Sequence, residues 1–266
     1  MGAAGVSGGL LTVVLGNATT TLGIVREGHV DAHWSVSSDP ARTADEWAVL
    51  VRGLVGDDLA DAEGVAVAAT VPGILTRWRE MMARHLPDLP LVVVGAGVRT
   101  GIPVLTDNPR EVGADRVANA LAAVTLHGGP VVVVDVGGTA TTLDVVNPAG
   151  QYVGGAIAPG VQVALEALGR RAAQLREVEL ARPRAVIARN TVEAVQSGLV
   201  FGTAAMVEGL VARAAEELGS PDGLRVVATG PYAELVAPEV ACFTDLEPHL
   251  TLLGLEQLFV RNSRTR

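Results

Sequence analysis

Two segments of this chain share one pattern of apolar and polar positions. Residues 14–25 read VLGNATTTLGIV and residues 135–146 read DVGGTATTLDVV, and the two segments align without a gap. Each follows an apolar run, at Leu10–Leu15 and at Val131–Val134, and leads into another apolar stretch. Apolar runs on either side of a short stretch of glycine and threonine are typical of a strand, a turn and a second strand. The sequence therefore predicts the same β-hairpin twice.

Each hairpin is followed by further strands and helices in a similar order. Short apolar runs predict buried strands, and apolar residues that recur every three or four positions predict helices. In the first half we expect the hairpin Leu10–Val25, strands Val30–Ser37, Val65–Thr70 and Leu91–Val94, and helices Ala44–Leu54 (capped by Asp39 or Thr43) and Ile74–His85. After a linking helix at 113–127, we expect the hairpin Val131–Val146, strands Tyr152–Ala158 and Arg225–Ala228, and helices Val161–Leu175, Thr191–Leu218 and Leu252–Arg261. Two halves of one design predict an α/β fold with an internal duplication.

Composition restricts the classes of protein to which the chain can belong. With 266 residues and 49% hydrophobic content, it can bury the core of one or two domains. We expect a soluble cytoplasmic protein with no membrane contact. No apolar run approaches the roughly 18 residues that span a bilayer, and the first residues lack the pattern of a signal peptide. A net charge of −9 without an arginine-rich block argues against nucleic acid as a partner.

Three residue types limit the chemistry that the chain can perform. All 20 basic residues are arginine, so a phosphate-loop lysine and Schiff-base chemistry are excluded. The single cysteine, Cys242, excludes an internal disulfide framework, and we interpret it as a small apolar residue on a late strand. The five histidines lie far apart in the sequence, without the spacing of metal ligands.

The repeated hairpin points to phosphate binding. Backbone N–H groups of glycine-rich turns and threonine hydroxyls donate hydrogen bonds to phosphates, and a carboxylate on the strand can hold a metal ion. Two-lobed phosphotransferases hold the phosphates of a nucleotide between two such hairpins. The second copy has the carboxylate, Asp135, whereas the first has Val14 at the aligned position. Much of the functional question depends on that difference.

Several other runs of residues resemble those of the type III pantothenate kinases. The runs are RTADEW at 42–47, GVRTGIPV at 97–104, DNPREVGADRVANA at 107–120, GGAIAPG at 154–160, RNTVEAVQSG at 189–198 and LTLLGL at 250–255. The resemblance extends from about Leu11 to Leu258, and the stretch 107–119 is its most specific part.

The resemblance implies the duplicated α/β fold of the acetate/sugar kinase–Hsp70–actin class, which is ribonuclease H-like. In that fold we expect two lobes, over 10–112 and 113–266, with a central cleft. The resemblance also implies a homodimer that phosphorylates pantothenate with ATP, the entry step of coenzyme A synthesis. A divalent cation such as Mg²⁺ and a monovalent cation, K⁺ or NH₄⁺, are implied as well.

On the acceptor side, the resemblance places the catalytic base at Asp115 in the run GADR. An oriented carboxylate can accept the proton of a primary alcohol that attacks a phosphoryl group. Gly113 and Ala114 are expected to bring the backbone close to the substrate. Arg116 either contacts the substrate or forms an ion pair with Asp115 or Glu111.

Other acceptor-side residues lie further away in the sequence. Asn190 and Thr191 correspond to a pair that reaches the substrate from the opposite subunit, and Asn190 also fits a helix cap. Thr106 is expected near the substrate, where the family has a tyrosine. We interpret Arg42 and Asp45 as ion-pairing residues at the start of a helix that lies at a dimer surface.

On the nucleotide side, the resemblance assigns residues of both hairpins and of a later loop. The nucleotide-binding residues are Gly16, Asn17, Gly137, Gly138, Thr139, Thr141, Thr142 and Gly230. Asp135 is expected to hold a monovalent or divalent cation.

All three nucleotide-binding elements depart from the family pattern. The first hairpin has Val14 in place of the metal-holding aspartate and lacks two further hydrogen-bonding side chains. The second has an extra glycine at 137–138, which changes the side chains that face the phosphates or forces a bulge. In the later loop, Pro231 replaces a glycine, which removes an N–H group and fixes φ. Phosphoryl transfer depends on positioning and electrostatics, so we expect weak or absent activity from the isolated chain.

Hypotheses of different classes follow. The first is a pantothenate kinase, or a phosphotransferase with another acceptor, and it is supported by Asp115, Asp135, Asp144 and the retained run at 107–116. The second is a catalytically inactive subunit, or pseudokinase, that forms a heterodimer with an intact homologue and contributes residues 190–191 to its site. The third is a regulator that senses pantothenate or a coenzyme A precursor without turnover.

Overall fold

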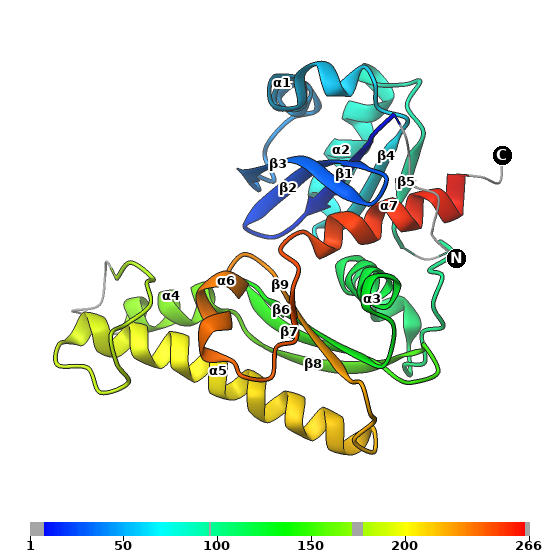
Figure 1. The fold of residues 1–266 in the computed structure, drawn as a ribbon. Coiled ribbons are helices and arrows are strands. Elements are labelled where there is room, and N and C mark those ends of the chain that lie inside the picture. The colour runs from blue at the N-terminus through cyan, green and yellow to red at the C-terminus, as the bar shows by residue number, and fades with distance from the viewer. Residues whose placement is uncertain (1–7, 96, 172–177, 264–266) are drawn as a thin grey trace. The chain divides into compact units, whose positions relative to one another are not determined.

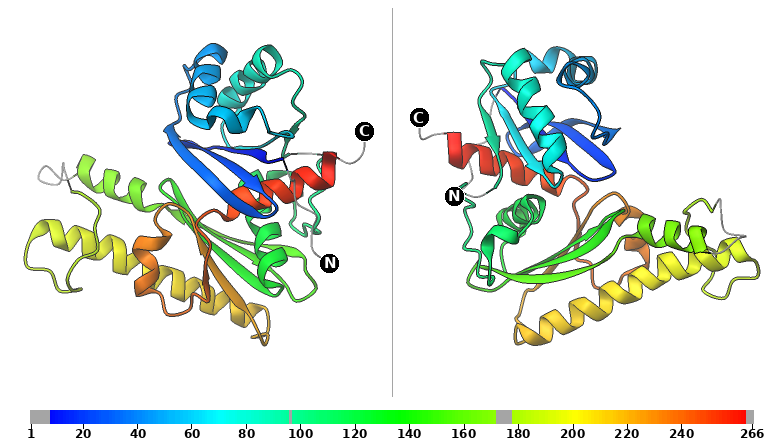
Figure 2. Two further views of the ribbon diagram at one scale, coloured as in Figure 1. Left: turned by 45° about the horizontal axis from the view of Figure 1, so that its top comes forward. Right: turned by 180° about the vertical axis from the view of Figure 1, so that it is seen from behind.

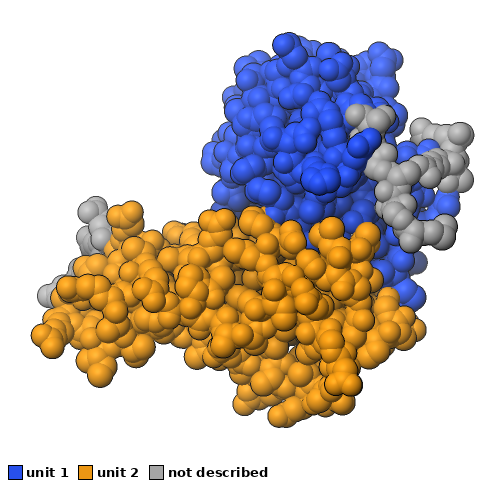
Figure 3. All heavy atoms as spheres, in the orientation of Figure 1, with its two compact units in different colours: residues 1–103, 107–122, 249–266 blue, residues 104–106, 123–248 orange. Residues whose placement is uncertain are grey.

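The chain folds into two compact units, each with its own five-stranded sheet. The computed structural model describes residues 8–95, 97–171 and 178–263. Unit 1 comprises residues 1–103, 107–122 and 249–266, and unit 2 comprises residues 104–106 and 123–248 (Figure 3). The α/β fold expected from the sequence is present in both units.

The sheet of unit 1 has the strand order β3-β2-β1-β4-β5. Its strands are β1 (Leu10–Leu15), β2 (Thr19–Arg26), β3 (His29–Ser37), β4 (Val65–Ala69) and β5 (Leu91–Val93). The first three strands are antiparallel, and β1, β4 and β5 are parallel. Helices α1 (Ala44–Val55) and α2 (Pro72–His85) pack on one face of the sheet, and α7 (Leu250–Ser263) packs against β1 and β4 (Figure 1).

Local sequence signals explain why unit 1 has these elements. Alternate residues of β1 and β2 enter one core together with the apolar faces of α1 and α2. Trp47 and Trp78 are fully buried there, edge to face, with 5.4 Å between ring centroids. Thr43 begins α1 as a capping box, because its Oγ1 accepts from the Glu46 N–H and Glu46 accepts from the Thr43 N–H. Of the two expected caps, Thr43 is therefore the correct one.

The sheet of unit 2 has the strand order β10-β9-β6-β7-β8. Its strands are β6 (Val131–Val136), β7 (Ala140–Val146), β8 (Tyr152–Pro159), β9 (Arg225–Thr229) and β10 (Asp245–Leu246). Its helices are α4 (Val161–Arg171), α5 (Thr191–Glu217) and the short α6 (Ala233–Val236). Helices α4 and α5 pack side by side, and α5 extends along the sheet (Figure 2). Three short 3₁₀ helices complete the described elements, at Gly56–Leu59, Pro109–Glu111 and Ala237–Glu239.

The two sheets repeat one topology, which confirms the duplication. Each has an antiparallel β-meander whose first strand continues into a parallel pair. Each also has a register shift at the same place, between Ile24 and Val25 in one and between Val145 and Val146 in the other. A bulge repeated at aligned positions is a feature of the design and not a defect.

The boundary between the units differs from the one expected at residues 112 and 113. Helix α3 (Ala114–His127) is divided, with 114–122 in unit 1 and 123–127 in unit 2, and α7 returns to unit 1. Gly254 of α7 lies against the backbone of Ala118, where a Cβ atom would overlap the Ala118 carbonyl. Thr251 also donates to Asn119 Oδ1 over 2.7 Å. This packing, between residues far apart in the sequence, holds the last helix in the first unit.

Most element boundaries agree with the sequence to within two residues. The last helix begins at Leu250, two residues before its expected start, and β10 and α6 were not expected. The expected end of the helix Val161–Leu175 lies outside the described residues.

Helix α5 is long and apolar enough to cross a membrane, with a mean hydropathy of 1.4 over an 18-residue window. The sequence analysis did not anticipate this, because Glu193, Glu208 and Arg213 interrupt the apolar run. One face of α5 is buried in the core of unit 2, through Val200, Val207 and other residues. Core helices of globular proteins have a similar length and apolar composition, so the apolar composition of α5 is explained by its buried face.

Candidate functional site

The two glycine–threonine hairpins occupy equivalent places in their sheets. Val14 is paired with Thr21 across β1 and β2, and Asp135 is paired with Thr142 across β6 and β7. Strands β1 and β6 have the same burial pattern, in which only the fifth residue, Val14 or Asp135, is half-exposed. The gapless alignment of the two segments therefore corresponds to an equivalence in space.

The first glycine of each turn is required by a close backbone approach. A Cβ atom on Gly16 would lie 2.7 Å from the Thr19 carbonyl oxygen, and one on Gly137 would overlap the Ala140 carbonyl. Any other residue would force these turns to open. Gly16 and Gly137 therefore have the same structural role, as their alignment predicts.

The extra glycine of the second hairpin lies in the turn and does not create a bulge there. The register of β6 and β7 continues without a shift up to the pair Val136–Thr141. The turn carbonyls accept hydrogen bonds from the start of α4: Gly137 from Val161, Gly138 from Val163 and Thr139 from Gly160, over 3.0–3.2 Å. The bulge offered as one consequence of the insertion is thus wrong at this place, because the added residue is held against the N-terminus of α4.

A glycine in the later loop makes room for the carboxylate of Asp135. Gly230 has φ +95°, and a Cβ atom on it would overlap Asp135 Oδ1. Pro231 follows at the second position of a turn closed by the Ala233 N–H and the Gly230 carbonyl, over 3.1 Å. Proline is common at that position of a turn. Pro231, which we expected to disturb this loop, therefore fits the geometry of the loop. The Tyr232 N–H also donates to the Val136 carbonyl, which ties the loop to β6.

Of two threonine hydroxyls in the second hairpin, one is hydrogen-bonded and the other is not. Thr142 Oγ1 donates to Asp144 Oδ2 over 3.2 Å, and the Tyr152 hydroxyl donates to Asp144 Oδ1 over 2.6 Å. Thr141 Oγ1 is buried and has no hydrogen-bond partner within the described part of the chain. Its counterpart in the first hairpin, Thr20 Oγ1, lies 2.9 Å from Ser38 Oγ. The unsatisfied hydroxyl is thus in the hairpin that keeps its carboxylate.

The second hairpin fits phosphates and a hard cation. It combines a half-exposed carboxylate, a tightly held glycine turn and hydroxyl groups, and hard cations favour oxygen ligands. Among residues 8–95, 97–171 and 178–263, no three histidine, cysteine or acidic side chains are grouped to hold a metal. A site with one carboxylate is typical of Mg²⁺, which takes its other ligands from substrate phosphates and water.

The first hairpin is less suited to phosphates than the second, and it lacks the carboxylate that would hold a cation. Gly16 is half-buried and Asn17 is exposed in the turn. Val14 offers no oxygen where the second hairpin has a carboxylate, and its side chain is half-exposed and not in the core.

Asp115 lies in the first turn of α3, in unit 1. Its Oδ1 accepts from the Arg116 backbone N–H over 2.9 Å, and its side chain is half-buried. A Cβ atom on Gly113 would lie 2.5 Å from the same oxygen, so Gly113 gives the carboxylate its place. Ala114 is the first residue of the helix. The Glu111 carboxylate, offered above as a partner of Arg116, accepts from Asn108 Nδ2 over 2.7 Å.

Asn190 caps α5, as one interpretation of the sequence predicted. Its Oδ1 accepts from the Glu193 N–H over 2.9 Å, and its Nδ2 donates to Glu193 Oε2 over 3.1 Å. Hydrogen bonds from Arg184 first, and from Asn190, hold the pKa of Glu193 below its ordinary value. Thr191 is exposed beside this cap. In unit 2, Thr106 is half-buried, and its Oγ1 has no partner in the described residues.

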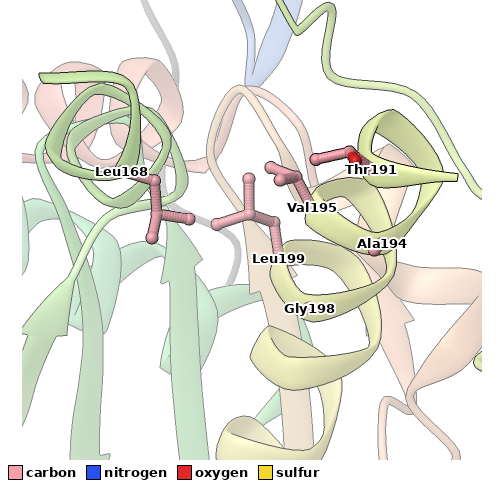
Figure 4. Close-up of a pocket in the computed structure, with 6 residues that line it drawn as sticks. All are labelled: Leu168, Thr191, Ala194, Val195, Gly198 and Leu199. Carbon is pink, nitrogen blue, oxygen red and sulfur yellow. The ribbon is translucent and has the colours of Figure 1, made fainter. Parts of the chain in front are cut away.

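An apolar groove of about 380 Å³ lies between α4 and α5 at Thr191. Leu168 of α4 faces Val195 and Leu199 of α5 across it, and Gly198 lies at its floor (Figure 4). Further apolar side chains are exposed nearby, since Ile187 is 88% exposed and Val192 is 46% exposed.

The structure divides the expected site residues between the two units. Unit 1 holds Gly16, Asn17, Gly113, Ala114, Asp115 and Arg116. Unit 2 holds Thr106, Asp135, Gly137, Gly138, Thr139, Thr141, Thr142, Asn190, Thr191 and Gly230. Within unit 2 the second hairpin and Gly230 come together around Asp135.

Sequence reasoning missed residues that support the second hairpin. Gly160 lies so close to Gly138 that a Cβ atom would overlap the Gly138 carbonyl, and Tyr152 is buried against Asp144. Gly160 ends the run GGAIAPG, which was noted only for its resemblance. Burial raises the pKa of the Cys242 thiol first, and the charge of Glu208 raises it further. A raised pKa agrees with the apolar role expected for Cys242. The expected strand is wrong here, because Cys242 lies in a turn before β10.

Close relatives share nearly the whole chain. A sequence profile of the Type III pantothenate kinase family matches residues 10–213. A "Type III pantothenate kinase" of Nocardioides sp. is 59% identical over 255 residues, which cover 96% of this chain and 99% of the relative. A "Type III pantothenate kinase" of Streptomyces griseus is 52% identical over 261 residues, with 95% and 98% covered.

Solved structures share the fold at much lower identity. The activator of 2-hydroxyisocaproyl-CoA dehydratase from Clostridium difficile aligns with a TM-score of 0.56 at 12% identity, over 96% of both chains. The ROK hexokinase of Thermus thermophilus aligns with a TM-score of 0.51 at 14% identity, over 94% of this chain and 97% of the hexokinase. These structures confirm the expected acetate/sugar kinase–Hsp70–actin fold, and the sequence matches show that this chain belongs to the type III pantothenate kinase family.

Proposed function

We propose that this chain binds ATP with a divalent cation through its second hairpin and phosphorylates pantothenate slowly, as a cytoplasmic enzyme. The observation that carries the proposal is the equal register of Val14 and Asp135 in otherwise equivalent hairpins. One phosphate-binding element keeps its carboxylate, its glycine turn and its loop, and the other has lost the carboxylate. This supports binding with impaired turnover, because positioning and electrostatics supply nearly all of phosphoryl-transfer catalysis.

The proposed roles follow from the chemistry of each group. Asp115 accepts the proton of the pantothenate hydroxyl, and its position is set by Gly113 and by the Arg116 N–H. The turn at 137–139 and the Thr141 hydroxyl contact the nucleotide phosphates. Asp135 holds the divalent cation, which would neutralise phosphate charge when it is bound. The requirement for K⁺ or NH₄⁺ is part of the proposal, without an assigned ligand.

Calorimetric titration with ATP and Mg²⁺ tests the nucleotide half of this proposal. The wild-type chain should bind ATP–Mg²⁺ with sub-millimolar affinity, and Asp135→Asn should weaken binding about tenfold or more, since the variant loses a charged ligand. Asp222→Asn, a change of the same kind at an exposed turn of unit 2, is the matched control. A folded wild-type chain that does not bind ATP–Mg²⁺ would contradict the proposal.

A second candidate function has its own observation. The groove at Thr191 and the exposed Ile187 and Val192 form an apolar surface beside the residues expected to reach a partner's substrate. A large exposed apolar surface favours a protein partner. We propose a dimer through this surface, either with a second copy or with an intact homologue that receives Asn190 and Thr191 from this chain.

Co-expression with an intact family member separates the two dimers. If the chain serves as an inactive subunit, a tagged copy should retain the homologue at equal stoichiometry. Asn190→Ala in this chain should then lower the activity of the mixed dimer while leaving its mass unchanged. A pure homodimer in the presence of the homologue would exclude the subunit function.

A further inference from the structure

We propose that Asp144 is a positioning residue for Thr142. It accepts the hydrogen bond of the Thr142 hydroxyl, so that the lone pairs of Thr142 Oγ1 face a cation held by Asp135. The inference rests on the proposed function and adds a residue to it. From the sequence, Thr142 was expected to bind phosphate, and for that its hydroxyl would have to donate a hydrogen bond to a phosphate oxygen. In the structure the Thr142 hydroxyl donates to Asp144 instead.

Asp144 is a buried carboxylate held by two hydroxyl groups. It is 0% exposed, and it accepts from Thr142 Oγ1 over 3.2 Å and from the Tyr152 hydroxyl over 2.6 Å. Tyr152 is itself buried at the start of β8. A buried carboxylate is costly unless it is hydrogen-bonded, so these donors are part of what keeps Asp144 in place. Both lie in unit 2 with Asp144.

The donation by Thr142 decides what its hydroxyl can offer to a ligand. A threonine hydroxyl has one proton and two lone pairs. Because the proton is directed at Asp144, the remaining capacity of Thr142 Oγ1 is that of an acceptor. An acceptor repels a phosphate oxygen and attracts a cation. Thr142 is therefore suited to a hard cation.

Strand geometry places this acceptor beside Asp135. Thr142 and Asp135 are direct partners across β6 and β7, and side chains of such a pair lie on one face, about 5 Å apart at Cβ. Asp144 is two residues along β7, so it lies on the same face. The half-exposed Asp135 and Thr142 have the fully buried Asp144 next to them. The arrangement is that of two ligands and the residue that orients one of them.

The first hairpin lacks the counterpart of Asp144. Thr21 is the counterpart of Thr142, and Gly23 stands at the position of Asp144. A Cβ atom on Gly23 would lie 2.6 Å from Leu252 Cδ1, so a side chain there would displace the Leu252 side chain of helix α7. Together with Val14, this removes both carboxylates from the first copy. A cation is therefore expected only at the second hairpin.

Substitution of Asp144 by asparagine tests the polarity directly. In Asp144→Asn the Tyr152 hydroxyl still donates to Oδ1, so Nδ2 faces Thr142 and donates to its oxygen. The Thr142 proton is then directed at the cation. Mn²⁺ binding, measured without nucleotide by paramagnetic resonance up to millimolar concentration, should weaken about 10–100-fold, as when an outer ligand partner is lost. An unchanged Mn²⁺ affinity in a folded Asp144→Asn chain would overturn the proposal.

Four further variants keep the test decisive. Tyr152→Phe also removes a hydrogen bond from Asp144 but leaves Thr142 as it is, so Mn²⁺ affinity should change much less than in Asp144→Asn. Thr142→Val should weaken Mn²⁺ binding, Thr142→Ser should restore it, and Thr21→Val in the first hairpin should leave it unchanged. If Asp144→Asn does not fold, the Thr142 pair decides, and wild-type affinity in Thr142→Val overturns the proposal.

Two separate measurements distinguish the role of Asp144 from the proposed kinase function. Mn²⁺ binding is measured without ATP, and ATP binding is measured separately. A chain that shows the expected Mn²⁺ pattern but binds no ATP keeps the role of Asp144 and loses the kinase. A chain that binds ATP–Mg²⁺ but shows no Mn²⁺ binding, or none that depends on Thr142, overturns the inference alone.

Discussion

At the scale of single residues, Val14 and Asp135 account for the main difference between two otherwise similar halves. They share a register position and a degree of burial, so the fold accepts either side chain. Only Asp135 has a glycine, Gly230, that opens a space for its carboxylate. The two positions therefore differ in charge and in the ligands that they offer.

The assignment of Asp115 as the base makes a clear prediction. Asp115→Asn keeps the size of the side chain and can still accept from the Arg116 N–H, but it cannot take the proton of the acceptor hydroxyl. Phosphorylation of pantothenate should fall by about 10²–10⁴-fold, while the affinity for ATP–Mg²⁺ stays within a factor of two or three. A single-turnover assay with radiolabelled ATP measures the first quantity and calorimetry the second. Activity equal to wild type would remove Asp115 from the mechanism.

Gly230 is predicted to tolerate a side chain poorly. Gly230→Ala adds a Cβ atom at φ +95° that overlaps Asp135 Oδ1. Gly223→Ala is the matched control, because its φ of +73° carries similar strain but nothing lies near its Cβ position. The control should cost about 1 kcal/mol of unfolding free energy, and Gly230→Ala about 1–3 kcal/mol more. Urea denaturation measures both, and equal losses would mean that the contact is unimportant.

At the scale of elements, local signals in the sequence were enough to place most strands and helices. The hairpins were found because apolar runs flank glycine and threonine, and α1 because a capping residue, offered as Asp39 or Thr43, precedes the expected helix Ala44–Leu54. Asp115 was found through a run of residues that resembles a family, and its chemistry agrees. These features depend on neighbours in the sequence.

Features that depend on distant residues could not be found in this way. The extra glycine was expected to disturb the hairpin, but the start of α4 holds the turn through hydrogen bonds to its carbonyl groups. The proline in the later loop was expected to do harm, but a turn at Gly230 accepts it. The pairing of Asp144 with Tyr152 also spans two strands. In each case the decisive contact comes from another element.

A half-buried acidic group at the edge of the second sheet predicts a pH dependence of stability. Burial alone would raise the pKa of Asp245, but hydrogen bonds from Thr244 and Arg225, with the charge of His127, lower it overall. The Arg225 guanidinium lies 2.6 Å from Asp245 Oδ1. Because the folded pKa is below the unfolded one, the stabilisation is complete above the unfolded value of about 4 and is lost as pH falls through the folded value.

Asp245→Asn should therefore lower the unfolding free energy at pH 7 by about 1–3 kcal/mol, the range for hydrogen bonds to charged groups. The difference from wild type should shrink as the pH falls below about 4. Urea denaturation followed by circular dichroism at several pH values measures this. Asp222→Asn, in an exposed turn, should show no such dependence. A difference that stays constant down to the lowest pH would contradict the assigned contacts.

At the scale of the whole molecule, the chain crosses between its units four times, and the last helix belongs to the first unit. The sequence order of elements suggested two successive lobes. Helix α7 instead packs on β1 and β4, where Phe259 lies against Gly64 and Leu252 against Gly23. The second unit is therefore an insertion between parts of the first. Its separate expression as 113–266 would leave α7 without its sheet.

The apolar surface beside Thr191 predicts a dimer that charge can disrupt. Ile187 is 88% exposed, and a glutamate in its place would be desolvated in an apolar interface. Light scattering should show two chains for the wild type and one for Ile187→Glu at micromolar concentration. Val49→Glu, at a residue 72% exposed on α1, should leave the mass unchanged. An Ile187→Glu chain that remains dimeric would place the interface elsewhere.

We propose that the chain is a family kinase limited by one missing carboxylate in its first hairpin. The most direct measurement is the rate of pantothenate phosphorylation by Val14→Asp at saturating ATP–Mg²⁺, compared with wild type and with Val14→Asn, which has nearly the same size without the charge. The account predicts a gain of at least about tenfold for aspartate and little for asparagine, as expected for electrostatic stabilisation of the transition state. No gain in a folded Val14→Asp chain that binds ATP–Mg²⁺ would contradict it.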